Sequence, residues 1–492
     1  MKRTRPVSRL IFAQTALLIM AGSVSLAPAD PAQAPTTVGA SAVPPAAEAR
    51  TTTAQAVPLH ATPAAIDPTQ TQAPPATAEQ SVVPPADLSA LLAEAEANSP
   101  ALRASEARLE AARRLPSQAE APLDPEVSVA YTNDGVSSLT LGERDMSVLA
   151  LTWTQEVRRS GKRTQAREVA LREADRTALD RDRLRLEVAA SVKSAYADLV
   201  RLDRTAAILE ETRSVLEELV QAARRRYEVG EGTQESVLKA QTGVLRLEAE
   251  SARVAQDRRA AEIRLNAAVG RSGDVPVGAA LTLPGGVLPE TPEALAEAVA
   301  AASPEIAVQQ AVVRREEAGV ELAKAEEKPD FVWSASYQNR GGLDPLVMGM
   351  FGVRLPVHRE RKQAAAVLQK ESELAAARQD LAEIQLRTRS AVRELVSRVE
   401  RADRLLRLFG QGVVPQAQSA LESARASYGV GRVGFLDLLD DVTVVLDARK
   451  EVAVQESERI QALAGLEPLL GRELIHVPGG PGKPGGQNAS LR

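Results

Sequence analysis

Apolar residues recur every three to four positions over long stretches of the chain, which is the spacing of a narrow stripe along a helix. Residues 162–229 contain neither Gly nor Pro, so one continuous helix is expected there. At about 1.5 Å per residue, such a helix would reach roughly 100 Å. Its narrow stripe is typical of a coiled-coil seam and differs from the broad apolar face of a globular helix. The stripe consists of Leu184, Val188, Val192, Ala195, Leu199, Leu202, Ala206 and Leu209.

Gly-bearing turns are expected to fold these helices into hairpins. The turn 230–232 returns the chain through a second helix, which we expect to end near Val269. In the second half, residues 361–409 lack Gly and Pro, and the return helix covers about 435–470. Pro415 interrupts the second long helix, and because Pro removes a backbone hydrogen bond we expect an irregular segment there.

Four short segments show the two-residue alternation of strands instead. They are residues 126–132, 147–154, 331–337 and 347–355, joined in pairs by loops that contain Gly and Asp. Half of the chain's aromatic residues lie in these segments, as the interfacial girdles of a membrane β-barrel require. Two ordinary hairpins capping a helical bundle remain an alternative. The aromatic residues concerned are Tyr131, Trp153, Phe331, Trp333, Tyr337 and Phe351.

The chain repeats itself at an interval of about 200 residues. Ser99-Pro100 recurs as Ser303-Pro304, and Tyr227-Glu-Val-Gly recurs as Tyr428-Gly-Val-Gly. Each half has the same order: a helix, two alternating segments, a very long helix, a Gly-marked turn and a second helix. We therefore expect a duplicated fold.

Composition supports a helical, exported protein. Charged residues make up 25% of the chain and aromatics only 2%, which is the bias of long packed helices. Lys2 and Arg3 precede an apolar stretch from about residue 10 to 27, the pattern of an export signal, although an N-terminal membrane anchor is the alternative. The expected divisions are a signal peptide (1–34), a disordered Ala/Pro/Thr-rich spacer (35–86), a first repeat (87–270), a linker (271–290), a second repeat (291–471) and a flexible tail (472–492).

Several function classes are disfavoured by the residues themselves. A net charge of −5 provides no basic surface for nucleic acid. The chain has no phosphate-binding loop and no nucleophile motif, so neither an enzyme nor a cofactor site is expected. With no Cys and with His60, His358 and His476 far apart, no metal site is expected.

The strands predict an oligomer if they enter a membrane. Four strands cannot close a barrel, and an open edge in lipid would leave unpaired backbone groups. Two chains would give an eight-stranded barrel whose lumen side chains largely fill, whereas three would give twelve strands and a usable bore. A cyclic trimer is therefore favoured for transport.

The two hairpin turns carry a family resemblance. Residues 430–440 read VGRVGFLDLLD and residues 229–237 read VGEGTQESV. Within the duplicated plan, these strings strongly resemble the TolC family of outer-membrane efflux proteins, over about residues 87–476. The overall spacing is similar to the heavy-metal (cobalt-zinc-cadmium) exporter branch.

The resemblance implies a mainly α fold with a small transmembrane β part. The expected assembly is a homotrimer in which duplicated helical hairpins form a periplasmic α-barrel and four strands per chain enter a twelve-stranded outer-membrane β-barrel. The implied function is the exit duct of a tripartite efflux or secretion system. The implied partners are a periplasmic adaptor (membrane fusion) protein and an inner-membrane pump, for example of the resistance-nodulation-division type.

The same resemblance assigns roles to two sets of residues. Asp437 and Asp440 match the family's gating carboxylates at the periplasmic aperture, and in a trimer they would form two stacked acidic rings. A solvated face, or carboxylates complementing the helix dipole, is the structural alternative for this pair. The adaptor-contacting residues at the hairpin tips would be Val229, Gly230, Glu231, Val430, Gly431 and Arg432.

A periplasmic adaptor or a structural coiled-coil protein is the competing function. An adaptor has one helical hairpin between β-rich domains, without duplication of the whole unit. A structural coiled coil has no use for paired alternating segments that carry both tryptophans. Duplication together with strands in both halves favours the duct.

Overall fold

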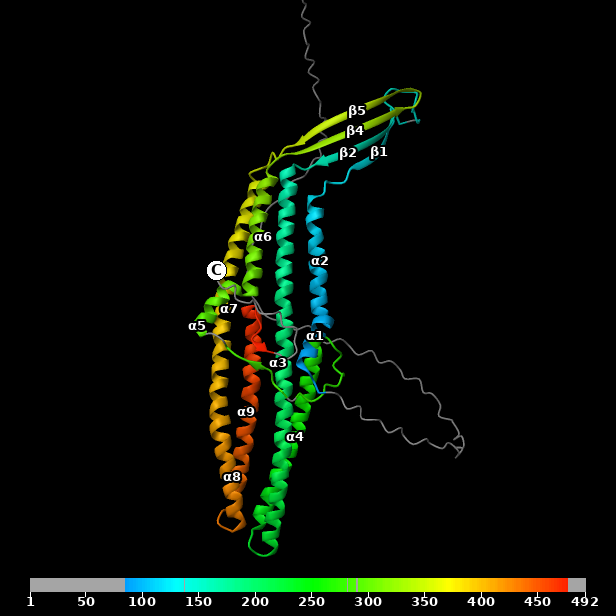
Figure 1. Ribbon diagram of the computed structural model, residues 1–492. Coiled ribbons are helices and arrows are strands. Elements are labelled where there is room, and N and C mark those ends of the chain that lie inside the picture. Colours follow the sequence, from blue (N-terminus) through cyan, green and yellow to red (C-terminus); the bar gives the residue numbers. More distant parts are fainter. Residues whose placement is uncertain (1–84, 137, 281, 289–290, 477–492) are drawn as a thin grey trace, which may run out of the picture. The chain divides into compact units, whose positions relative to one another are not determined.

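The computed structural model describes residues 85–136, 138–280, 282–288 and 291–476. All of them belong to one unit, which runs from residue 79 to residue 492. The expected signal peptide, nearly all of the expected spacer and most of the expected tail lie outside the described residues. The described part is mainly helical and contains a four-stranded and a two-stranded sheet (Figure 1).

The structure confirms that one architectural unit occurs twice. Each half supplies a helix broken in two, a β-hairpin and a long helical hairpin. The first repeat contains α1 (Leu88–Asn98), α2 (Pro100–Glu120), β1 (Glu126–Thr132), β2 (Val148–Val157), α3 (Ser160–Glu228) and α4 (Gln234–Val269). The second contains α5 (Pro292–Ala302), α6 (Pro304–Glu326), β4 (Asp330–Arg340), β5 (Leu343–Arg354), α7 (Gln363–Leu408), η1 (Phe409–Val413), α8 (Val414–Gly429) and α9 (Phe435–Leu470).

The Ser-Pro landmarks mark the helix break at the start of each repeat. Ser99 ends α1 and begins α2, and its hydroxyl accepts a hydrogen bond from the N–H of Leu102. Pro100 and Pro304 each occupy the first position of the following helix, where a missing N–H costs nothing. The same dipeptide therefore produces the same break twice.

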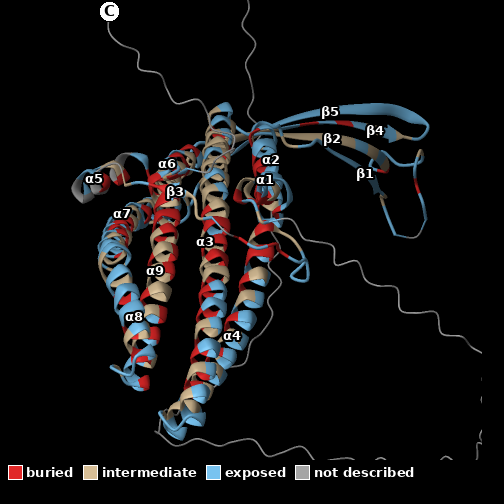
Figure 2. Cartoon of the chain, turned by 60° about the horizontal axis from the view of Figure 1, so that its bottom comes forward, coloured by how far each residue is buried: buried red, intermediate tan, exposed pale blue. Residues whose placement is uncertain are grey.

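The longest helix, α3, has 69 residues and is continuous, as predicted. The single narrow stripe expected along it is only partly right: Leu199 and Leu209 are fully buried, but Ala206 is exposed. Between residues 190 and 209 the helix is instead buried on several sides. The reason is tertiary, because α3 packs against α2, α4, α6 and α9 (Figure 2).

The second long hairpin contains the expected irregularity. The π-helical segment η1 lies between α7 and α8, and the N–H of Val414 bonds to the carbonyl of Phe409, five residues back. Pro415 falls in the first turn of α8. A π-bulge accommodates a local disruption of the α-helical ladder without ending the helix. The chain therefore continues in the same direction past Pro415.

The two β-hairpins join into one antiparallel sheet of order β1-β2-β4-β5. The predicted strands are all present, and β1 has the predicted bounds. The second hairpin is longer than predicted: the turn is confined to Gly341-Gly342, and residues 343 and 344, expected in the loop, belong to β5. A tight turn is possible because Gly341 adopts a positive φ of 70°.

A short sheet ties the linker to the end of the second repeat. β3 (Gly285–Gly286) pairs with β6 (Ile475–His476), and Ile475 is buried. The first residues of the expected tail are thus part of the folded unit. Buried residues follow the middle of the helices, whereas β5 and the hairpin ends are largely exposed (Figure 2).

Candidate functional site

The four-stranded sheet has two chemically different faces. Antiparallel pairing keeps odd-numbered residues opposite odd-numbered residues across all four strands, for example Val129 opposite Leu151 and Leu151 opposite Tyr337. Paired residues share a face, so the odd-numbered side chains form one face. That face consists of Val127, Val129, Tyr131, Leu149, Leu151, Trp153, Gln155, Val157, Phe331, Trp333, Ala335, Tyr337, Asn339, Val347, Gly349, Phe351 and Val353.

The opposite face is rich in polar side chains. Thr152 donates a hydrogen bond to Ser336 across β2 and β4 at 3.0 Å. The polar members of this face are Glu126, Ser128, Thr132, Thr152, Thr154, Glu156, Asp330, Ser334, Ser336, Gln338 and Arg354. β5 is the exception, because its residues on this face include Leu346, Met348 and Met350. Alternation between an apolar and a polar face, as β2 and β4 show it, is the pattern of a membrane β-barrel with a polar lumen.

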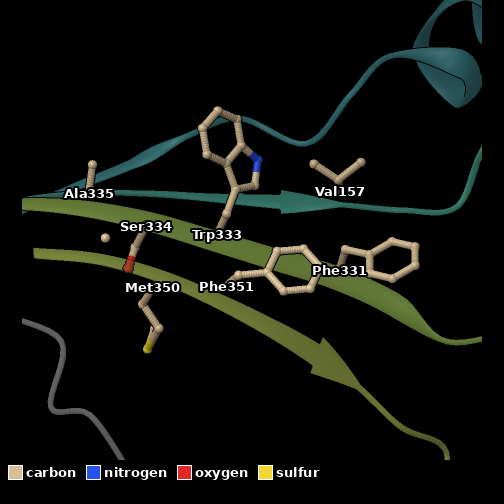
Figure 3. A pocket seen from close by; sticks show the side chains of 8 residues that line it. Val157, Phe331, Trp333, Ser334, Ala335, Met350 and Phe351 are labelled. Atoms are coloured by element: carbon tan, nitrogen blue, oxygen red, sulfur yellow. The ribbon is translucent and has the colours of Figure 1, made fainter. Parts of the chain in front are cut away.

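All six aromatic residues singled out in the sequence lie on the apolar face. The Trp153 and Trp333 rings meet edge to face with centroids 4.9 Å apart, and the Phe331 and Phe351 rings stack at 5.9 Å. Trp333, Phe331 and Phe351 border an open groove of about 680 Å³, lined also by Val157, Ser334, Ala335, Gly349 and Met350 (Figure 3). The remaining two aromatics, Tyr131 and Tyr337, lie further from the helices.

The height of the apolar face fits a bilayer. On β2 it extends from Leu149 to Val157, eight positions along the strand. At about 3.3 Å per residue this is about 26 Å before strand tilt is counted. The apolar band of an outer-membrane barrel is about 25 Å tall.

The sheet ends in two open edges. β1 pairs only with β2, and β5 pairs only with β4, among the described strands. Most side chains of both edge strands are exposed. Because neighbouring strands alternate in direction through the order β1-β2-β4-β5, β5 of one copy and β1 of the next would again be antiparallel.

The helices form two rows, and each row, like the sheet, ends in two open edges. Nearer the sheet, α2, α3, α6 and α7 pack in that order; nearer the hairpin tips, α4 packs on α3, α3 on α9, and α9 on α8 (Figure 1). First-repeat elements therefore occupy one flank of each row, and second-repeat elements occupy the other. The sheet follows the same order, with β1 on the first flank and β5 on the second.

Apolar side chains remain exposed along these flanks. On α4, Leu238 and Leu245 are 54% and 63% exposed, one heptad apart. On α7, Leu368 and Leu386 are 64% and 65% exposed. α4 and α7 already pack within the chain through their buried sides. The exposed apolar residues on each helix can therefore form a second helix–helix contact, with another partner.

The hairpin tips place the two repeated turns in equivalent conformations. Gly230 and Gly431 have φ values of 79° and 75°, a left-handed conformation that favours glycine. The preceding Val229 and Val430 are each 71% exposed. Two exposed apolar residues on paired turns provide a matched contact surface.

Arg226, which was not singled out in the sequence, links the two tips. Its Nη1 donates a hydrogen bond to the Tyr428 carbonyl oxygen at 2.7 Å, and its guanidinium lies 4.9 Å from the centroid of the Tyr428 ring. Tyr428 in turn meets Phe435 edge to face. The only sequence signal for this link was the Tyr428 landmark of the repeat; the arginine partner could not be identified without the tertiary arrangement.

The two predicted aperture carboxylates lie on the exposed side of α9. Asp437 is in the first turn, where a carboxylate complements the positive end of the helix dipole, so it has a local structural role. Asp440 lies one turn later. Both are exposed, opposite the buried residues Leu438 and Val442.

A buried lysine at the junction of helix and sheet was also missed as a structural residue. Lys162 is only 4% exposed, and its Nζ lies 2.7 Å from Asp330 and 3.4 Å from Glu326. Asp330 also accepts a hydrogen bond from the N–H of Arg159. The contact ties the start of α3 to the start of β4. Lys362, which lies 200 residues later at the start of the second long hairpin, is exposed.

None of the helices in the described residues is both long enough and apolar enough to span a bilayer. No group of three or more His, Cys, Asp or Glu in the described ranges could hold a metal ion.

Comparison with known proteins identifies the class. A family model described as outer membrane efflux protein matches residues 91–271 and 295–472, one segment in each repeat. The chain therefore belongs to the outer membrane efflux protein family, which also places it in the outer membrane.

Individual relatives are more distant. Outer membrane efflux protein BepC of Brucella suis biovar 1 (strain 1330) is 26% identical over 292 residues, which cover 57% of this chain and 62% of BepC. The chain thus matches less than two thirds of that relative's length.

Solved structures share the fold at low identity. The outer membrane protein VceC of Vibrio cholerae has a TM-score of 0.66 and 20% identity, covering 79% of this chain and 96% of VceC. The Neisseria gonorrhoeae MtrE outer membrane channel, in its open state, has a TM-score of 0.65 and 18% identity, covering 79% of this chain and 89% of MtrE.

Proposed function

We propose that the chain is the outer-membrane exit duct of a tripartite efflux or secretion system and conducts substrates passively, without catalysis. The observation that carries this proposal is the open two-faced sheet, whose edges β1 and β5 lie on the same flanks as the open edges of the helical rows. A contact between one flank and the opposite flank of the next copy is heterologous, and such contacts close into a ring when the rotation allows it.

Three copies satisfy the requirements of the sheet best. An unpaired edge in hydrocarbon costs several kcal/mol for each backbone group. Two copies would provide about eight strands, whose lumen side chains largely fill, whereas three would provide about twelve and leave a bore. In the trimer the apolar face meets lipid and the polar face lines the lumen, with aromatic side chains toward both ends.

The exposed helical stripes would become buried by the same closure. The flank formed by α2 and α4 would face the flank formed by α7 and α8 of the next copy, producing a continuous α-barrel. The exposed apolar side chains on α2, α4 and α7 would be buried in these contacts and would stabilise the trimer. The apolar residues that supply them include Leu115, Leu238, Leu245, Leu368 and Leu386.

The hairpin tips would receive the partners. Val229, Gly230, Glu231 and Val430, Gly431, Arg432 would contact a periplasmic adaptor, which couples the duct to an inner-membrane pump. Asp437 and Asp440 would line the periplasmic aperture of the trimer. Replacement of both aspartates by Ala is expected to increase the conductance of the closed pore, since it replaces the six side chains that narrow and charge the constriction with smaller, neutral ones.

The absence of cysteine from the chain makes a direct test possible. One cysteine is placed on β1 at Val129 and a second on β5, at residues 347, 348 and 349 in turn. Oxidation of the protein in outer-membrane vesicles should give a covalent trimer for at least one register. Val129→Cys with Leu151→Cys is the matched control, because these residues are already opposite each other in one chain and should link without raising the mass.

The outcome separates the duct from its competitor. A trimer ladder that disappears under reducing conditions supports the duct. A soluble periplasmic monomer or dimer with no link at any register would contradict it, and would return the strands to hairpins on an adaptor or a structural coiled coil.

A further inference from the structure

The two return helices, α4 and α9, correspond position by position. Each has 36 residues, and each ends at a left-handed glycine, Gly270 or Gly471. An offset of 201 residues relates both their starts and both their ends. Residues at this offset occupy equivalent positions after equivalent turns.

Equivalent positions on the exposed sides of these helices carry opposite charges. Asp440 on α9 corresponds to Lys239 on α4, and Asp447, one heptad later, corresponds to Arg246. All four side chains are exposed. Within the described part of the chain, Arg246, Asp440 and Asp447 form no ion pair, whereas Lys239 pairs with Glu235 at 2.8 Å. Three of these four charges therefore have no ionic partner within the chain.

Contacts between α4 and α9 show how these charges are oriented. A Cβ added to Gly243 on α4 would lie 3.4 Å from Leu216 on α3 and 3.7 Å from Leu439 on α9, and Glu250 pairs with Lys450. Glu250 thus marks the side of α4 turned toward α9, and Gly243 lies where that side borders α3. An α-helix turns by about 100° per residue about its axis. Lys239 and Arg246 are therefore rotated by about 40–60° from Gly243 around the axis of α4, away from the buried Ala240.

The acidic positions can be placed on α9 in the same way. Asp440 and Asp447 lie about 80–100° from Leu439, on the side away from the buried Leu438 and Val442. α3 packs on the opposite side of both helices, as the ion pairs Arg258–Asp203 and Arg449–Glu211 show. Because α4 and α9 run in the same direction from the tips, the basic and acidic pairs face the same side (Figure 1).

We propose that Lys239 and Arg246 form basic rings near those of Asp440 and Asp447, so that the aperture is lined by both signs of charge. The inference rests on the proposed trimeric duct. The basic side chains offset the neighbouring carboxylates, and the first repeat thereby contributes to the ion selectivity of a gate whose acids come from the second. The charges that line the aperture are thus shared between the repeats, and neither hairpin alone determines the field in the pore.

The test is ion selectivity in planar bilayers, with the full-length trimer in a KCl gradient. Lys239→Gln with Arg246→Gln should raise the cation-to-anion permeability ratio by about sevenfold or more, because a unit charge several Å from the ion path changes a cation's energy and an anion's energy by about RT in opposite directions. Asp440→Asn with Asp447→Asn should lower the ratio by a similar factor. The fourfold variant should return close to the wild-type ratio.

Glu248→Gln is the matched control, since Glu248 lies on the opposite side of α4 from Lys239 and its neutralisation should leave the ratio unchanged. If the double variant does not assemble, Lys239→Gln alone should give a smaller shift in the same direction. An unchanged ratio in a trimeric Lys239→Gln/Arg246→Gln protein, with a clear shift in the Asp variant, would overturn the basic rings but not the duct. A wild-type protein that forms no trimer in the membrane would overturn the duct itself and the inference with it.

Discussion

The most informative single perturbation is the buried ion pair between the two repeats. Lys193 on α3 and Glu467 on α9 are each only 2% exposed, and Nζ lies 2.6 Å from Oε2. The other oxygen of Glu467 accepts hydrogen bonds from the N–H groups of Leu474 and Ile475, both at 2.9 Å. The pair therefore holds α3, α9 and the segment that leads into β6 together.

The geometry predicts the size of the effect. Breaking a buried pair by removing one partner costs about 3–5 kcal/mol, because the other charge stays buried. Lys193→Met should fall near about 3 kcal/mol, since the carboxylate keeps two backbone donors. Glu467→Gln should fall near about 5 kcal/mol, since the ammonium loses its counter-charge. The double variant buries no net charge and keeps an acceptor for both N–H groups, so it should lose less than either single variant.

Urea unfolding of the detergent-solubilised protein, followed by far-ultraviolet circular dichroism, measures these differences. Hydrogen exchange of the Leu474 and Ile475 amides should accelerate in a Glu467→Ala variant, which removes their acceptor. Arg398→Met is the control, because its pair with Glu394 is exposed and should contribute less than about 1 kcal/mol. Additive losses in the double variant, with no coupling between the two sites, would refute the reasoning.

Three further predictions concern other parts of the molecule. A hydrogen bond from Arg271 lowers the pKa of Glu94 below its ordinary 4.5. The pair therefore stabilises the fold above pH 4.5, and this contribution is lost as the pH falls through the lowered pKa. In thermal melts, Glu94→Gln should flatten the decline of stability below pH 4.5. Arg226→Met should loosen the tips, seen as a broader distance distribution between spin labels on the two tip turns, and an unchanged distribution would show that the link is dispensable. Leu151→Arg on the apolar face of the sheet should cost about 2–4 kcal/mol in the bilayer and reduce trimer in outer-membrane fractions, whereas Ser128→Arg, at an exposed position on the polar face, should not; equal losses would contradict the assignment of the faces.

Local patterns were sufficient to predict the elements and their duplication. The Gly- and Pro-free run predicts α3 because nothing in it interrupts the helical ladder, and the Ser-Pro dipeptides predict the helix breaks because Pro suits a first helical turn. Two-residue alternation likewise predicts strands β1 and β2, since side chains on a strand point alternately to two faces. The tip glycines belong to the same class of signal, because only a positive φ at Gly230 and Gly431 closes these turns without strain.

The tertiary structure alone decided which residues meet. The pairing of β2 with β4 joins segments more than 170 residues apart, and it places all six aromatic side chains on one face. Arg226 and Lys193 are ordinary exposed-helix residues in the sequence, yet one binds the opposite tip and the other is buried against Glu467. Helical and strand periods depend on neighbouring residues and can be predicted from them, whereas the burial of a charge depends on which distant helix packs over it. Sequence alone therefore determined the repeated elements of this efflux protein, and packing between the repeats determined its faces, its link between the tips and its buried ion pair.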